Sequence, residues 1–114
     1  MPPRKLEADE QGLLERLLSQ DFLGRDELIR QMPALRVSAD CSSCGSLEFV
    51  NVGQKAQIEQ RIPVEAVGFD EDGVPIHILL HVVDGAISSL EIYRVEGAEV
   101  QRMPYYETLR LETN

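Results

Sequence analysis

The sequence "VPIHILLHVVDGAISSLEIY", residues 74–93, carries the strongest indication of the fold of this chain. Val, Ile and Leu dominate on both sides of Asp84–Gly85, as they do in β-strands that face a core. An Asp-Gly pair between two such runs favours a two-residue type I′ turn, in which both turn residues adopt positive φ. The sequence therefore predicts an antiparallel hairpin that turns at Asp84–Gly85.

An uninterrupted register, counted outward from this turn, predicts which side chains share a face. The expected cross-strand pairs are Val83–Ala86, Val82–Ile87, His81–Ser88, Leu79–Leu90, Ile78–Glu91, His77–Ile92 and Ile76–Tyr93. The face that we expect to pack on helices carries Val74, Ile76, Ile78, Leu80 and Val82. The opposite face carries His77, Leu79, His81 and Val83, with Leu90 and Ile92 across from them. That face is too apolar to be fully solvated, so we expect a loop, the C-terminal segment or another chain to cover part of it.

The elements around the hairpin follow from the hydrophobic period. Residues 9–20, "DEQGLLERLLSQ", and residues 24–32, "GRDELIRQM", have apolar spacings of three and four, so two helices are predicted. Asp9 is the expected cap of the first helix, and Pro33 ends the second. After Pro33 the period changes to two, and strands are predicted at 34–37, 46–52, 61–69, 74–83, 86–95 and 108–112.

These elements define one α+β domain over residues 1–114, with residues 1–8 as a flexible N-terminus. We expect a helical hairpin packed on one face of a mostly antiparallel β-meander of about four to six strands.

The charge of the chain restricts its partners. Twenty acidic and eleven basic residues give a net charge of −9, which opposes binding to nucleic acid or to an anionic membrane. The acidity either keeps the protein in solution or complements a basic partner surface. The N-terminus shows no export signal, and no apolar run approaches the ~20 residues that a membrane span needs. With only two cysteines, a cytoplasmic protein is expected.

Cys41 and Cys44 in "ADCSSCGSLEF", residues 39–49, are candidate metal ligands. A strand follows the pair rather than a helix N-terminus, which disfavours thioredoxin-like redox chemistry. A zinc site needs four ligands, so a monomeric site would need His77 or His81 and a carboxylate, and two chains could instead pool four sulfurs. The alternative is a tight turn without metal, and the sequence leaves open whether the cysteines are free, disulfide-bonded or metal-bound.

Other polar residues are weaker candidates for chemistry. "FDEDG", residues 69–73, resembles the start of a calcium loop but lacks its later acidic ligand, so a hairpin turn is expected. His81 faces a serine in the predicted register, but no third group orients it as a catalytic base. Glu91 is predicted on the core face, where Arg94 or Arg36 would have to pair with it unless an edge position or a register slip leaves it in water. His77, His81, Glu91 and Tyr93 form a candidate interaction or ligand face.

The segments "LERLLSQDFLGRDELIRQM" and "RIPVEAVGFDEDGVPIHILLHVVDGAISSLEIYRVEGAEVQRMP" resemble a family of short, uncharacterised bacterial proteins. The resemblance covers roughly residues 9–104 and is most specific in the hairpin from Leu79 to Tyr93. It implies a helical pair, a cysteine-containing loop and this hairpin. It implies no activity, and it carries over no catalytic residue.

Three functions are consistent with the sequence. The first is an acidic, non-catalytic protein that binds another protein with a basic surface, as an immunity-type protein or a regulatory inhibitor does, as a monomer or a homodimer. The second is a metal-binding module, with zinc on Cys41 and Cys44. The third is a small enzyme or ligand-binding protein that uses the region of His77, His81 and Glu91.

Overall fold

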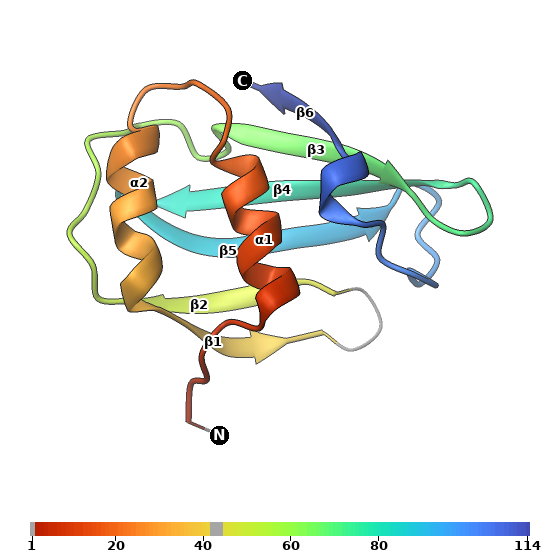
Figure 1. Cartoon of the computed structure of the whole chain (residues 1–114), viewed down its shortest axis with the longest axis horizontal. Helices are drawn as coiled ribbons and strands as arrows, with labels where there is room; N and C mark the ends of the chain where they lie inside the picture. The colour runs from red at the N-terminus through yellow and green to blue at the C-terminus, as the bar shows by residue number, and fades with distance from the viewer. Residues whose placement is uncertain (1, 42–44) are drawn as a thin grey trace.

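Two helices lie side by side on one face of an antiparallel sheet in the computed structural model, which describes residues 2–41 and 45–114 (Figure 1). The helices are α1 (Ala8–Leu17) and α2 (Arg25–Gln31), and a 3-10 turn, η1 (Met32–Ala34), contains Pro33 and leads into the sheet. The strands are β1 (Leu35–Asp40), β2 (Leu47–Asn51), β3 (Val64–Phe69), β4 (Pro75–Val83), β5 (Ala86–Arg94) and β6 (Arg110–Thr113). A second 3-10 turn, η2 (Tyr106–Thr108), precedes β6. The predicted α+β class is confirmed.

The strand order across the sheet is β1-β2-β5-β4-β3-β6, and every neighbouring pair is antiparallel. Strands β3, β4 and β5 follow one another as a meander, as expected. At the two edges the order departs from a simple meander, because β2 pairs with β5 and the C-terminal β6 returns to pair with β3. Each of these two pairings joins segments far apart in the sequence.

The core lies between the helices and the sheet. Leu14, Leu17 and Leu28 of the helices are fully buried against Ile78 and Leu80 of β4. The helix-facing residues of β4 are therefore those predicted from the alternation. The start of α1 differs from the expectation: Glu7, not Asp9, is the N-cap, and its backbone N–H donates to the Glu10 carboxylate at 2.8 Å.

The register of the β4–β5 hairpin corrects the prediction. Val83 faces Ala86 and Val82 faces Ile87 as expected, but a β-bulge then makes Ser88 an additional residue, and His81 faces Ser89. Beyond the bulge every predicted pair shifts by one: Leu79 faces Glu91, Ile78 faces Ile92, His77 faces Tyr93 and Ile76 faces Arg94. Leu90 and Ile92 therefore lie in the core, and Glu91 does not. The second face of the sheet is correspondingly less apolar than predicted.

The Asp84–Gly85 turn has the predicted geometry, with φ of 51° at Asp84 and 77° at Gly85. The long loop between β2 and β3 passes this end of the sheet (Figure 1). Its Ala56 N–H donates to the Gly85 carbonyl at 2.8 Å, and a Cβ on Gly85 would lie only 2.2 Å from the Ala56 carbonyl oxygen. The glycine is therefore required both for its φ and for the close approach of a second backbone.

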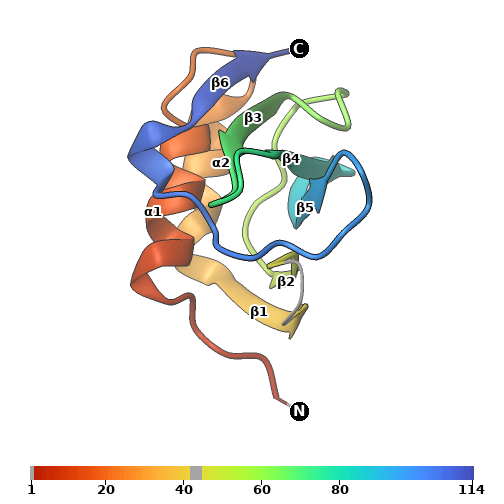
Figure 2. The ribbon, with the colours of Figure 1, turned by 90° about the vertical axis from the view of Figure 1, so that its right-hand side faces the viewer.

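The C-terminal segment, defined here as residues 95–109, runs around the opposite end of the sheet from β5 to the helix side (Figure 2). Tyr106 of η2 packs on α1, where a Cβ on Gly12 would lie 2.5 Å from the tyrosine ring. Pro104 and Leu109 pack on Gly68 of β3, where a Cβ would lie 2.6 and 2.7 Å from them. Two glycines thus make room for this segment.

Candidate functional site

The four residues of the predicted interaction face lie together on the sheet. His77, His81, Glu91 and Tyr93 all belong to the face opposite the helices, which we call the open face. In the predicted register Glu91 and Tyr93 fell on the helix side, and the bulge at Ser88 turns them over. The open face also carries Glu48 of β2, Ser89 of β5, Leu79 of β4, Glu65 and Val67 of β3, and Arg110 and Glu112 of β6.

An aromatic pair occupies one row of this face. The rings of His77 and Tyr93 stack with their centroids 5.3 Å apart and an angle of 15° between their planes. The two residues are direct cross-strand partners, and Val67 of β3 continues the row next to His77. Tyr93 keeps 40% of its surface exposed. The stack therefore holds a tyrosine ring in a fixed orientation at the surface.

His81 is held between a carboxylate and a guanidinium. Its Nε2 lies 2.8 Å from Oε1 of Glu91, and its Nδ1 accepts a hydrogen bond from Nε of Arg61 at 3.3 Å. Because the guanidinium can only donate, the neutral His81 ring carries its proton on Nε2 and donates it to Glu91. Arg94 and Arg36, the partners considered for Glu91, do not make this contact. The arrangement fixes His81 and Glu91 on the surface, with Ser89 rather than Ser88 across from the histidine.

A row of carboxylates crosses the open face next to the aromatic pair. Glu91, Leu79, Glu65 and Glu112 are successive cross-strand partners on β5, β4, β3 and β6. Glu65 and Glu112 are direct neighbours, and two like charges in directly opposed positions destabilise a sheet. A side-chain N–H of Asn114 donates to Glu65 at 3.0 Å. Because the amide of asparagine is neutral, this hydrogen bond does not compensate the negative charges of Glu65 and Glu112. We call Glu91, Glu65 and Glu112 the acidic row.

The predicted cysteine site lies partly outside the described residues, because Cys44 is not among them. Cys41 follows β1, is half-buried, and its sulfur is not a free thiol. Its backbone N–H donates to the Ser46 carbonyl, and its own carbonyl accepts from the Gly45 N–H. Among residues 2–41 and 45–114, no three His, Cys, Asp or Glu side chains are grouped as metal ligands. Zinc on Cys41 and Cys44 stays a prediction.

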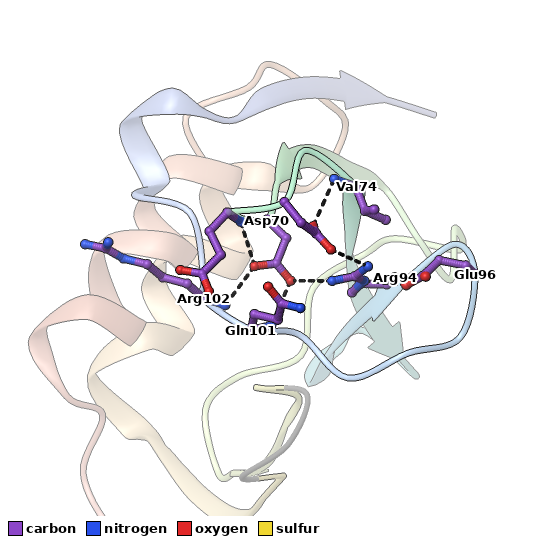
Figure 3. A network of polar contacts seen from close by, with 8 residues as sticks. Asp70, Val74, Arg94, Glu96, Gln101 and Arg102 are labelled. Carbon is purple, nitrogen blue, oxygen red and sulfur yellow. Dashed lines mark hydrogen bonds and ion pairs between the residues drawn. The ribbon is translucent and has the colours of Figure 1, made fainter.

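A buried ionic cluster that the sequence did not reveal holds the C-terminal segment (Figure 3). Asp70 accepts hydrogen bonds from the backbone N–H groups of Glu71, Gln101 and Arg102, at 2.8, 2.7 and 2.8 Å. It also accepts from the guanidinium of Arg94 at 3.0 Å. Burial opposes its charge, but these four donors outweigh burial and lower the pKa of Asp70 to about 2.

Arg94 completes the cluster from β5. Besides Asp70, its guanidinium donates to Glu96 and to Asp72, the latter at 2.9 Å. The pKa of Arg94 is raised above its ordinary value, most of all by the hydrogen bond to Glu96. Burial opposes this rise, and the hydrogen bonds to Asp72 and Asp70 add to it. "FDEDG" is the predicted hairpin turn, with Gly73 N–H bonded to the Asp70 carbonyl. What the sequence did not show is that its first aspartate binds a segment 31 residues further on.

A groove of about 630 Å³ lies between the N-terminal half of α1 and the C-terminal segment. Apolar side chains of α1, the sheet and the C-terminal segment line it: Leu13, Leu47, Phe69, Ile92, Met103, Pro104, Tyr105 and Tyr106. Asp9, Glu10, Glu71 and Arg102 supply its charged atoms. The walls come from five separate parts of the chain, so no local pattern in the sequence indicated this groove.

In the described part of the chain, no helix is of a length and apolarity that could span a membrane. Neither a curated protein nor a solved structure matches the chain. Residues 3–104 match the family described as a domain of unknown function, DUF6984, a range that includes both helices and β1 to β5. The resemblance to an uncharacterised family is thereby confirmed, and the chain belongs to the DUF6984 family.

Proposed function

We propose that this chain is a non-catalytic, cytoplasmic interaction domain whose open face docks a protein with a basic surface. The acidic row of Glu91, Glu65 and Glu112 is the observation that carries the proposal. Opposed carboxylates cost folding stability, and positions where a chain departs from local stability rules are commonly functional. A basic partner relieves this repulsion when it binds.

The row of His77 and Tyr93, next to the acidic row, suits the centre of an interface. Tyrosine is enriched at interface hot spots, since it offers a large contact area and a hydroxyl with few rotatable bonds. Tyr93 is already oriented by His77, so little side-chain entropy is lost when a partner covers it. His81 and Glu91 are likewise fixed by their mutual hydrogen bond. The open face therefore combines an apolar anchor with fixed negative charge.

The overall charge supports the same kind of partner. A net charge of −9 attracts a basic protein over a distance of about a Debye length and accelerates the encounter. An immunity-type protein or a regulatory inhibitor works in this way, by covering a functional surface of its target. The proposal therefore predicts an association that weakens with salt.

A photo-crosslinking residue at position 93 tests the proposal in cells of the source organism. The expected result is a covalent adduct with one basic protein, identified by mass spectrometry. The matched control carries the same residue at position 15, since Glu15 lies on α1, on the helix side of the molecule. Adducts of the same protein at both positions contradict docking on the open face.

The partner then allows a measurement with purified proteins. The dissociation constant is expected to rise at least tenfold between about 50 and about 500 mM salt, because exposed charges are screened. A dissociation constant that is independent of salt contradicts the proposed role of the acidic row.

The substitution Glu112→Gln separates binding from folding. It removes one of two opposed carboxylates, so the free energy of unfolding is expected to rise by about 0.2–1 kcal/mol. The same change is expected to weaken partner binding. Glu99→Gln, a carboxylate of the C-terminal segment outside the acidic row, is the control with the same change of net charge. Loss of stability together with loss of binding in Glu112→Gln would point to a structural role instead.

A further inference from the structure

The groove between α1 and the C-terminal segment has the dimensions and lining of a small-molecule site. Ligand sites commonly measure about 300–1,000 Å³ and are mostly apolar with a few polar groups, and this groove measures about 630 Å³. Leu47 and Ile92 are core residues, with 4% and 3% of their surface exposed, so the apolar wall is part of the packed sheet. Met103 and Tyr106 belong to the opposite side.

Two of the four charged residues of the groove, Glu71 and Arg102, are held in place by Asp70. The backbone N–H groups of Glu71 and Arg102 both donate to the same oxygen, Oδ1 of Asp70, at 2.8 Å each. The side chain of Arg102 extends away from the cluster toward α1 (Figure 3). The backbone of both residues is therefore fixed by a fully buried carboxylate, and the groove exists before any ligand binds.

Three of the charged groups at the groove are left without a partner. Glu10 is bonded to Arg4 at 2.8 Å, which neutralises it. The carboxylates of Asp9 and Glu71 and the guanidinium of Arg102 make no hydrogen bond or ion pair with the residues that the structure describes. Two unpaired negative charges against one positive charge leave a net charge of −1.

Tyr105 also lines the groove. The pKa of Tyr105 is raised first by its hydrogen bond with Tyr106 and then by the charge of Glu107, and Asp9 has the smallest of the effects. The groove thus has a mostly apolar lining and a net negative charge. A ligand that matches both features is apolar over most of its length and brings one positive charge.

We propose that this groove binds an organic cation with an apolar body, such as an aromatic or short-chain aliphatic primary amine. Its apolar part packs on Leu13, Leu47 and Ile92, and its ammonium group lies between the carboxylates of Asp9 and Glu71. The site is separate from the open face, so the inference does not rest on the proposed function.

The test is an NMR titration of the ¹⁵N-labelled full chain with three probes that share the phenethyl group: phenethylamine, 2-phenylethanol and 3-phenylpropionate. Phenethylamine is expected to shift amide signals of residues 9–13, 45–47, 102–103 and 105–106 at concentrations up to about 10 mM, the range of weak fragment binding. The alcohol is expected to bind more weakly and the carboxylate not at all. Equal binding of all three probes, or shifts elsewhere in the chain, overturns the proposal.

Matched variants identify the charges. Asp9→Asn and Glu71→Gln are each expected to raise the dissociation constant for phenethylamine about two- to fivefold, as expected for exposed ion pairs. Arg102→Gln is expected to lower it, and Glu99→Gln, outside the groove, to leave it unchanged. All four are surface substitutions, and an unchanged ¹⁵N spectrum away from the mutated residue confirms that each variant is folded. Unaltered affinity in both carboxylate variants contradicts the proposed site.

Discussion

Asp70 makes the stability of the whole chain depend on pH. Its pKa is about 2 in the folded protein, below the ordinary value of 3.8, so the unfolded chain binds more protons between these values. The stabilisation from Asp70 is therefore complete above about pH 4–5 and is lost as the pH falls toward 2. We expect the thermal midpoint to fall steeply over this range, which a series of thermal melts between pH 2 and pH 7 would measure.

Asp70→Asn isolates this contribution. The amide keeps the shape of the carboxylate, but its nitrogen cannot accept the hydrogen bonds that Asp70 receives, and Arg94 loses a buried counter-charge. At pH 7 the midpoint is expected to fall by on the order of 10 °C, and the slope between pH 4 and pH 2 to become shallower. Glu99→Gln serves as the control. If the curves of the wild type and Asp70→Asn run parallel down to pH 2, Asp70 is not the titrating group.

Gly85 and Gly73 are both turn glycines with positive φ, 77° and 85° respectively, so the cost of an alanine can be compared at the two positions. A Cβ at Gly73 would meet no atom within 4 Å, whereas one at Gly85 would lie 2.2 Å from the carbonyl oxygen of Ala56. Gly73→Ala is expected to cost only the strain of positive φ, about 1–2 kcal/mol. Gly85→Ala is expected to cost at least about 3 kcal/mol, because the β2–β3 loop must also move away. Urea denaturation of both variants decides this, and equal losses would show that the loop yields freely.

The β4–β5 hairpin shows what a local pattern can and cannot predict. The strands, the turn and the helix-facing side of β4 followed from alternation and from Asp84–Gly85, since all of these are set by residues close in sequence. The register did not follow, because one extra residue at Ser88 moved five pairs. A signal for it was present: Ile87 and Leu90 are three residues apart, and strict alternation cannot bury both.

The candidate site was likewise only partly predictable from local sequence. His77, His81, Glu91 and Tyr93 were identified from their residue types on the predicted hairpin, but their common face depends on the bulge. The acidic row also needs the pairing of β6 with β3, between Glu112 and Glu65, which lie 47 positions apart in the sequence. The groove and the Asp70 cluster each join segments that no short-range pattern connects.

Deletion of Ser88 tests whether the bulge itself is needed for the fold. Without this residue, Val82–Ile87 and His81–Ser89 become consecutive pairs of an uninterrupted register, and Leu90 and Ile92 stay in the core opposite Leu80 and Ile78. We therefore expect the deletion variant to remain folded by circular dichroism, as does Ser88→Ala, which keeps the bulge. An unfolded deletion variant, beside a folded Ser88→Ala, would show that the local twist of the bulge is itself required.

The extent of the folding unit differs from the extent of the family match. The match ends at residue 104, after the two amides that Asp70 binds, Gln101 and Arg102. The structure continues with η2 and β6, which cover the groove side of α1 and the outer edge of β3. Leu109 is only 3% exposed and fills the space above Gly68. Residues 105–113 therefore belong to the folding unit, because Leu109 is a core residue and Tyr106 and Leu111 pack against the core.

A chain that ends at residue 104 tests this boundary. It loses the burial of Leu109, part of that of Tyr106 and Leu111, and the whole β3–β6 ladder, so its free energy of unfolding is expected to fall by at least about 3 kcal/mol. Urea denaturation of the two chains measures the difference. In the full chain, Leu109→Ala is expected to reproduce about 2–4 kcal/mol of the loss, because the cavity it leaves lies between α1 and β3. If the shortened chain were as stable as the full one, the core would end at the family boundary, and β6 would act only to bring Glu112 beside Glu65. That outcome would remove the structural explanation for β6 and strengthen the case that the opposed carboxylates exist for a partner.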